Sequence, residues 1–234
     1  NSFCTNALCA PSRATLLTGT YSHINGMYGN PETPETTGTL MPRFDEGQET
    51  IAEILKRNGY QTGMVGKWHL TANPAHLGFD YFVYKNGAGG PYYEPGGYFG
   101  NAKLGSDTIV EQTHQGYATD VNTDLAIKGI QQFKQPFFMM VQYFNAHRPF
   151  DPPHKYEHLY DNARVPEPAT FWDNYENRSG AAKLAWMRIE DMPDFSPPSY
   201  LTPRQRRQWN YQRFMRHFLG TVRSQDDNIG RLLE

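Results

Sequence analysis

The chain has 234 residues, a formal net charge of −2, two cysteines and 14% aromatic residues. A charge so close to zero gives no electrostatic case for binding nucleic acid or an anionic membrane, and two cysteines are too few for a disulfide scaffold. No apolar run reaches the length of a membrane span, and no signal peptide is visible. The length alone permits one large globular domain or two small ones.

The predicted elements alternate between helix and strand. Residues 9–19 read as a helix in which Pro11 suits the first turn, Ser12 satisfies an orphan amide and Gly19 forms the C-cap. Apolar periodicity then predicts, in chain order, a helix over 49–58, a strand over 61–65, a helix over 119–133, a strand over 136–143 and long helical structure from about 204 to the end. The strand over 136–143 is continuously apolar, which is typical of burial on both faces. Two helix-to-strand passages predict an α/β fold, a parallel-rich sheet flanked by helices.

Two long segments lack this periodicity. Residues 86–100 are rich in glycine and tyrosine, and residues 151–203 are rich in proline. Loops this long inside a compact domain tend to be functional or disordered, and their aromatic residues favour ordered loops around a binding cleft. The chain starts without an initiator methionine and stops inside a helical pattern, so we expect an internal fragment of a longer domain, incomplete at both ends.

Cys9-Ala10-Pro11-Ser12-Arg13, closed by Gly19, is the most informative stretch. A cysteine phosphatase needs its arginine six positions after the cysteine, whereas Arg13 follows after four. A zinc site would need further ligands at short spacing, and a Cys4–Cys9 disulfide would close a very small, strained loop. A buried inert cysteine remains the plain alternative. A nucleophile at a helix N-terminus faces free N–H groups and a positive dipole end, which favours a sulfate or phosphate ester.

Gly66-Lys67-Trp68-His69-Leu70 follows the predicted strand over 61–65. It is not a Walker A motif, because Gln61 stands where glycine is required and Trp68 stands where Ser or Thr follows the lysine. At a strand end Lys67 and His69 would point the same way. A cation beside an imidazole suits an anionic ester and a hydroxyl nucleophile, although the segment taken alone is better explained as a solvated strand end.

A third segment, Asn145-Ala146-His147-Arg148-Pro149, follows the predicted strand over 136–143. Loops at the carboxyl ends of parallel strands are where α/β proteins place ligands. A lone histidine here is more often structural or exposed than catalytic. His154 and His158 follow in a loop whose spacing could suit a metal.

In this order along the chain, the three segments resemble the formylglycine-dependent sulfatases of the alkaline-phosphatase-like superfamily. The resemblance implies that Cys9 is oxidised after translation to formylglycine (3-oxoalanine), whose hydrate is the nucleophile and a metal ligand. It implies that Arg13 holds the hydrate, that Lys67 binds sulfate and that His69 is the base. It also implies that His147 contacts sulfate or the leaving group.

The resemblance further implies a divalent cation, Ca²⁺ or another, whose remaining ligands are expected outside this chain. By the same resemblance, residues 1–234 would be part of a single catalytic domain, and the loops 86–100 and 151–203 would lie around the substrate cleft. Ala146 stands where the family commonly has proline, which leaves the role of Arg148 less certain. The residues expected to bind substrate are Arg148, Asn145, Tyr92 and Tyr93. Those expected to be bystanders are Asp226, Asp227, His154 and His158.

Smaller matches at 77–82 and 225–230 extend the resemblance over most of the chain, and the Tyr92-Tyr93 pair with 166–170 looks most like bacterial polysaccharide sulfatases. The N-acetylglucosamine-6-sulfatase and mucin-desulfating branch is the nearest. The implied function is removal of sulfate from a sulfated carbohydrate, in polysaccharide or glycosaminoglycan degradation. The implied partners are that substrate and a formylglycine-generating maturation enzyme, with no nucleic acid, and the implied location is periplasmic or secreted.

Two alternatives stay open. A phosphonate or phosphate diester hydrolase of the same superfamily also can carry a Cys-x-Pro-Ser-Arg segment. If Cys9 is not converted, the chain could instead belong to a non-catalytic relative that binds a sulfated glycan.

Overall fold

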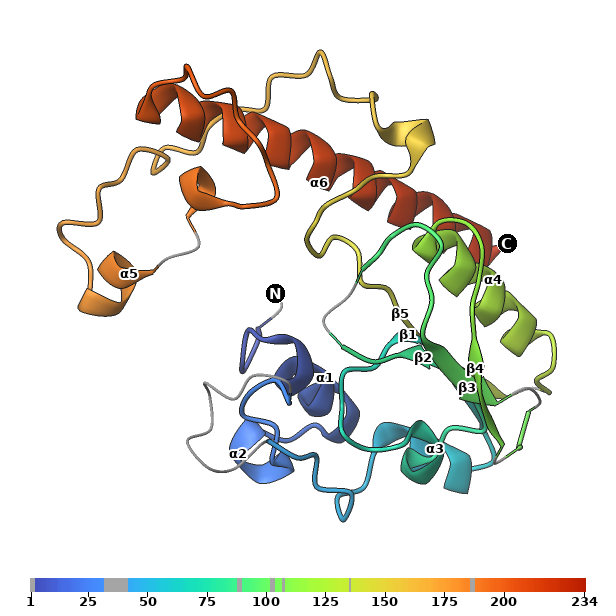
Figure 1. Cartoon of the computed structure of the whole chain (residues 1–234). Helices are drawn as coiled ribbons and strands as arrows, with labels where there is room; N and C mark the ends of the chain where they lie inside the picture. The colour runs from blue at the N-terminus through green and yellow to red at the C-terminus, as the bar shows by residue number, and fades with distance from the viewer. Residues whose placement is uncertain are drawn as a thin grey trace. The chain divides into compact units, whose positions relative to one another are not determined.

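The computed structural model describes residues 3–31, 42–87, 90–101, 104–106, 108–134, 136–185 and 188–234 (Figure 1). These residues form two compact units. Unit 1 comprises Asn1–Phe144 with Asn228–Glu234, and unit 2 comprises Asn145–Asp227. That both units belong to one catalytic domain stays a prediction.

Unit 1 is built around a five-stranded sheet with the order β4-β3-β2-β1-β5. Its strands are β1 (Gln61–Lys67), β2 (Tyr81–Lys85), β3 (Tyr98–Asn101), β4 (Ile109–Gln112) and β5 (Phe137–Gln142). Its helices are α1 (Cys9–Thr18), α2 (Ser22–Asn25), α3 (Ile51–Arg57), the 3-10 turn η2 (Pro74–Leu77) and α4 (Ala118–Ile130).

The predicted parallel core of the sheet is confirmed. β1 pairs in parallel with β2 on one side and with β5 on the other, so that Gly63 faces both Tyr81 and Met139. β3 and β4 extend the sheet with antiparallel pairing, which makes it mixed. β3 takes in residues 98–100, so the prediction of a loop over the whole of 86–100 is wrong at its end. Residues 88 and 89 of that segment lie outside the described part.

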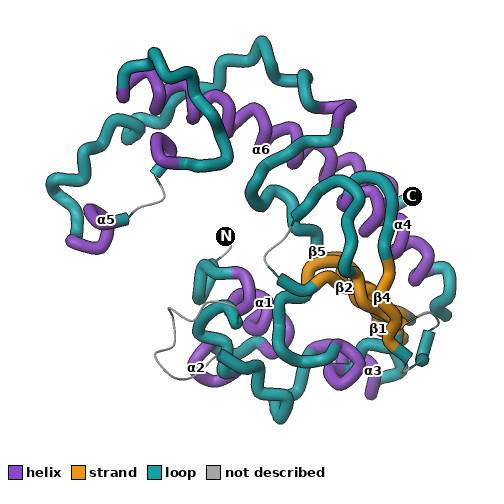
Figure 2. The backbone as a smooth tube through the Cα atoms, viewed as in Figure 1, coloured by secondary structure: helices purple, strands orange, loops and turns teal. Residues whose placement is uncertain are grey.

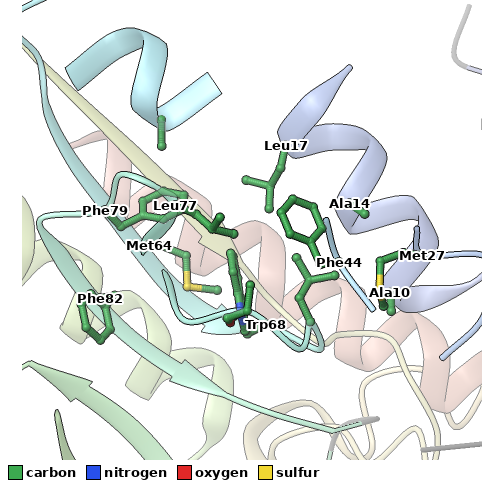
Figure 3. Close-up of a cluster of buried hydrophobic side chains, with 13 residues drawn as sticks. Ala10, Ala14, Leu17, Met27, Phe44, Met64, Trp68, Leu77, Phe79 and Phe82 are labelled. Atoms are coloured by element: carbon green, nitrogen blue, oxygen red, sulfur yellow. The ribbon is translucent and has the colours of Figure 1, made fainter. Parts of the chain in front are cut away.

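Helices cover both faces of this sheet. On one face, Ala10, Ala14 and Leu17 of α1 pack with Ala52 of α3 against strand residues such as Met64, around the fully buried Trp68 (Figure 3). On the other face, α4 covers the next residue of β1, Val65, through its own apolar side. Adjacent strand residues therefore enter different cores, as the pleat requires. α1 is thereby fixed beside the carboxyl-end side chains of β1.

Local signals explain where the helices begin and end. Gly19 adopts a left-handed φ of 67° and donates its N–H to the Thr15 carbonyl, which confirms the predicted C-cap. Thr50 and Glu53 cap the start of α3 reciprocally. The expectation that Ser12 caps α1 is wrong, because the residue before the helix, Leu8, begins it without a side-chain cap.

The predicted strand over 136–143 is present as β5, but its burial differs from the expectation. All six residues of β5 are half-buried. β5 hydrogen-bonds to β1 alone among the described strands and ends the sheet order, so it is an edge strand and not a central one. β5 is apolar because its side chains pack partly against the hydrophobic core on each face of the sheet.

Unit 2 is mostly irregular, as the sequence predicts for 151–203 (Figure 2). It contains η3 (His154–Tyr156), α5 (Gly180–Leu184), η4 (Ile189–Asp191) and most of α6 (Pro203–Leu233). The long final helix is thus confirmed, and Asp226 and Asp227 lie on it. Among the described residues, no helix combines the length and apolarity that a membrane crossing needs.

Candidate active site

The candidate site begins at Cys9, which is the first residue of α1 and is half-buried. The next backbone amide, that of Ala10, donates to Asn30 Oδ1 at 3.1 Å. Asn30 thus satisfies one of the amides that the first turn leaves without a helical partner. Cys4 and Cys9 are not joined by a disulfide, and the Cys4 thiol instead contacts the Asn6 carbonyl and the Ser12 hydroxyl.

Lys67 reaches this helix start from the end of β1. Its side chain is 3% exposed, and Nζ lies 3.3 Å from Cys9 Sγ. A buried ammonium is costly unless anionic or polar groups surround it. The structure therefore places a positive charge directly at the atom that the sequence singles out as the precursor of a nucleophile.

Arg13 ties α1 to the ends of two parallel strands. Its Nη1 donates to the Lys67 carbonyl at 2.7 Å and to Gln142 Oε1 at the end of β5. Burial lowers the pKa of Arg13 from 12.5 to about 10, against the opposing electrostatic effect of Cys9. The side chain still carries its charge at neutral pH. It holds the helix start and both strand ends in one place.

Gly66 allows β1 and β5 to come this close. Its φ of 107° is one that residues with a side chain rarely adopt. A Cβ at this position would also collide with the Gln142 carbonyl. Glycine is therefore required where the Gly66–Leu70 segment begins, and the Gln142 side chain that holds Arg13 is brought within reach.

His69 is fully buried, but it does not continue the strand. β1 ends at Lys67, and His69 has a left-handed φ of 62°. The expected alternation that would point Lys67 and His69 the same way therefore does not apply. Trp68 between them anchors the turn, because it packs in the core and donates Nε1–H to the Ala72 carbonyl at 2.7 Å.

The two tyrosines expected to bind substrate lie in different surroundings. Tyr92 is 1% exposed and packs against Tyr117 and Phe144 in a small core of its own. Tyr92 therefore packs inside this core, and its expected role toward substrate stays a prediction. Tyr93 is half-buried at the border of that core, against Tyr117, and its substrate role stays a prediction.

The segment that begins at Asn145 lies in unit 2, and its side chains form hydrogen bonds with other residues of that unit. Asn145 Nδ2 donates to the Thr221 carbonyl at 3.1 Å, and His147 Nδ1 lies 2.9 Å from the Arg148 carbonyl. Arg148 donates through Nε and Nη2 to the two carboxylate oxygens of Asp194, at 3.0 and 2.7 Å. This two-point ion pair raises the pKa of Arg148. The roles of these residues toward a ligand stay predictions.

The residues with loosely metal-like spacing do not form a metal site. His154 and His158 are exposed and pair locally with Glu157 and Asp161. Asp227 accepts from the Tyr156 hydroxyl and pairs with Arg223 on α6. No group of three or more His, Cys, Asp or Glu side chains among the described residues is arranged to hold a metal ion. The described residues thus do not by themselves fit the cation that the sequence implies.

The arrangement in unit 1 suits an anionic ester. The N-terminus of α1 presents amides and a positive dipole end beside two cations, Lys67 and Arg13. The sequence found both cations and the cysteine but missed Gln142 and Asn30. A signal for Gln142 was available, since it is a polar residue at the end of an apolar strand. Asn30 gave no comparable signal.

A family model described as Sulfatase matches residues 1–234. The N-acetylglucosamine-6-O-sulfatase of Bacteroides thetaiotaomicron is 33% identical over 282 residues, which cover 100% of this chain and 47% of that protein. Human arylsulfatase A is 42% identical over 83 residues, covering 33% of this chain and 16% of that protein. The solved structure of BT4656 in complex with its substrate D-glucosamine-2-N,6-O-disulfate matches with a TM-score of 0.82 and 31% identity, covering 100% of this chain and 53% of that one. The chain therefore spans about half the length of the first of these relatives.

Proposed function

Because the chain belongs to the sulfatase family, we propose that the protein containing it hydrolyses sulfate esters of a sulfated carbohydrate, with Cys9 as the precursor of the nucleophile. The observation that carries the proposal is the contact of Lys67 Nζ with Cys9 Sγ at 3.3 Å. It joins two segments that sequence reasoning selected separately, 58 positions apart.

The atom that stands at the site is a thiol sulfur, and in the proposed enzyme an oxygen of hydrated formylglycine takes its place. The hydrate supplies two hydroxyl groups on one carbon, of which one attacks sulfur while the alcohol leaves, and the other loses its proton so that the carbonyl re-forms and sulfate is released. This chemistry needs positive charge around the sulfate oxygens and a group that accepts the proton.

We assign those needs to three residues of unit 1. Lys67 neutralises charge on the sulfate oxygens, since its ammonium lies 3.3 Å from Cys9 Sγ and is shielded from water. Arg13 fixes the helix start and thereby the direction in which residue 9 points. His69, buried at the turn after β1, is the proposed base.

His147 and Arg148 complete the proposal from the segment after β5, as the resemblance implies. His147 is proposed to contact sulfate or the leaving oxygen. Since Arg148 holds Asp194 with two donors, we propose that it orients this segment. As the resemblance implies, it is also proposed to contact a polar group of the sugar. Asn145, Tyr92 and Tyr93 remain proposed substrate contacts.

A divalent cation, Ca²⁺, is proposed to belong to the working enzyme as an electrostatic partner of the sulfate oxygens. The described residues contain no group of three or more His, Cys, Asp or Glu side chains arranged to hold it. The proposed partners are the sulfated carbohydrate and a maturation enzyme that oxidises Cys9, and the proposed location is periplasmic or secreted.

The proposed substrate class is a 6-O-sulfated glucosamine unit. It is supported by the 33% identity to an N-acetylglucosamine-6-O-sulfatase over the whole of this chain. The similarity to BT4656, which was solved with a disulfated glucosamine, points to the same sugar.

The test uses the full protein, expressed with a maturation enzyme and assayed for sulfate release from N-acetylglucosamine-6-sulfate. Cys9→Ala removes the nucleophile, so sulfate release is expected to fall to the background rate. Cys4→Ala is the matched control, because Cys4 is exposed and five positions earlier, and it is expected to keep wild-type activity. Sulfate release by Cys9→Ala at the wild-type rate would disprove the assignment.

Two further measurements separate the alternatives. Reaction of the Cys9 peptide with hydroxylamine, followed by mass spectrometry, distinguishes an aldehyde from a thiol and hence an enzyme from a non-catalytic glycan binder. Turnover of an aryl phosphonate monoester beside an aryl sulfate distinguishes the phosphonate hydrolase from the sulfatase. We expect the aldehyde and the faster turnover of the sulfate.

A further inference from the structure

Unit 2 contains a polar pocket that the proposed chemistry does not use. It has a volume of about 460 Å³ and lies between the segment after Arg148, residues 194–196 and α6. Its polar and aromatic lining comprises Asp151, Asp194, Ser196, Trp209, Arg213 and His217. A volume in this range is typical of sites for small ligands, which fall at roughly 300–1,000 Å³.

His217, which lines the pocket, has a buried ring nitrogen without a hydrogen-bond partner among the described residues. His217 is 9% exposed, and its Nδ1 lies 3.2 Å from the Phe150 carbonyl. Since a carbonyl can only accept, Nδ1 carries the proton, and in a neutral imidazole Nε2 is then an acceptor. Among the described residues Nε2 has no hydrogen-bond partner. Burial and Arg213 lower the pKa of His217, which keeps the ring neutral at neutral pH.

The charges around the pocket nearly cancel. The carboxylate of Asp194 is 7% exposed and is neutralised by the two-point contact with Arg148. Asp151 and Arg213 are exposed residues of opposite charge at the same pocket. A second sulfated unit would therefore find no excess of positive charge here, whereas the hydroxyl groups of an uncharged ligand would find both donors and acceptors.

The apolar part of the lining suits the face of a ring. Trp209 is half-buried and lines the pocket together with Phe195 and Pro149. Phe195 is itself 8% exposed and is held edge-on against His217. A pyranose has C–H groups on its faces and hydroxyl groups on its rim. An aromatic face can pack against the C–H groups, and a carboxylate, a guanidinium and a hydroxyl beside it can hydrogen-bond to the sugar hydroxyls.

We propose that this pocket binds an uncharged sugar unit of a glycan, with Trp209 against the ring face and Asp151 and Arg213 hydrogen-bonding to its hydroxyls. The proposal rests on the proposed function for the choice of a carbohydrate. It adds that the protein recognises an unsulfated sugar through unit 2, and thus a glycan longer than the sulfated unit alone.

The experiment measures binding by calorimetry, with the full protein and two uncharged probes, a tetramer of N-acetylglucosamine and a tetramer of galactose. Wild-type protein is expected to bind at least one of them. Trp209→Ala and Asp151→Asn are each expected to weaken that binding at least fivefold, since each removes one of the main contacts. Trp172→Ala and Asp191→Asn are matched controls, because both residues line a different pocket of unit 2, and they are expected to bind as the wild type does.

The proposal is overturned if neither tetramer binds the wild type, or if both pocket variants keep wild-type affinity and the wild-type melting temperature. Because neither probe carries sulfate, binding is read independently of sulfate release. A protein that binds the tetramer without hydrolysing a sulfate ester contradicts the proposed function alone. One that releases sulfate from a monosaccharide but binds neither tetramer contradicts the pocket alone.

Discussion

The two units hold their candidate functional side chains in different ways. In unit 1, Lys67 and His69 are almost completely buried, and Arg13 bonds to groups at the ends of two strands far away in the sequence. In unit 2, His147 contacts the neighbouring Arg148 carbonyl, and Arg148 is held by one carboxylate at the end of an irregular segment. Regular structure fixes the first set, and side-chain pairing fixes the second.

This difference follows from what each unit has available. Parallel strands bring their carboxyl ends to one edge, so a short helix beside that edge meets several segments at once. The described part of unit 2 contains no sheet. Individual ion pairs and aromatic contacts, such as that of Phe150 with Phe214, hold its irregular segments instead. Substitutions that remove one contact at a time from each unit test this difference.

Lys67→Met is expected to lower kcat/KM for a sulfate ester by about 10²–10³-fold, because removing one preorganised charge from a transition state has this order of effect. Methionine fills a similar volume, so the melting temperature should change little. Lys85→Met is the matched control: Lys85 is in register with Lys67 on the neighbouring strand, but its Nζ binds the Gly96 carbonyl. Equal kinetic losses in the two variants would show that Lys67 has no special role.

Arg13→Ala is expected to lower the free energy of unfolding by about 2–4 kcal/mol, because it leaves the Lys67 carbonyl and the Gln142 amide oxygen without this donor. Urea denaturation of the full protein measures the change. Arg57→Ala removes an arginine that pairs with Glu49 at the surface, and its effect should be clearly smaller. Similar urea midpoints for both variants would contradict the interlocking role of Arg13.

Arg148→Ala is expected to destabilise unit 2 by about 1–3 kcal/mol, since the enclosed carboxylate of Asp194 loses its two-point partner. Hydrogen exchange of the amides near Asp194 would report the loosening. Adding Asp194→Asn to the same variant should restore part of the stability. Arg178→Ala breaks an exposed pair with Asp173 instead, and exchange there should stay confined to neighbouring amides.

His217→Gln is expected to flatten the acid side of the stability profile. Because burial and Arg213 lower the pKa of His217 below its ordinary value of 6.5, the unfolded chain binds this proton more readily than the folded protein. The contribution of His217 to stability is therefore present above pH 6.5 and is lost as the pH falls below it. Nearby Asp151 and Glu157 oppose this shift, so the effect should be small. Thermal melts between pH 7 and 5 test it, and identical slopes for variant and wild type would exclude it.

Much of unit 1 could be predicted from the sequence because its signals are local. Gly19 marks the end of α1, and the apolar periodicity locates α3, α4, β1 and β5 to within a few residues. The cysteine, arginine and lysine of the candidate site were singled out by the resemblance of their motifs to a known family. The resemblance correctly implied the sulfatase family.

What could not be predicted depends on distant partners or on backbone conformation. The left-handed φ of His69 breaks the strand alternation, and single-residue conformations of this kind have no reliable signal outside glycine and asparagine. Asp194 lies 46 positions after Arg148 in a segment without periodicity. The burial of Tyr92 depends on Tyr117 and Phe144, which stand in other elements.

The two hydrogen bonds of Arg13 have a consequence for the order of folding. Its two acceptors lie 54 and 129 positions further along the chain, so each contact closes a long loop, and loop closure carries an entropic cost that must be met before the contact stabilises anything. The α1 helix can form early from its own residues. The geometry around residue 9 is complete only after β5 has paired with β1, so a ribosome must have synthesised the chain beyond Gln142 before this geometry exists.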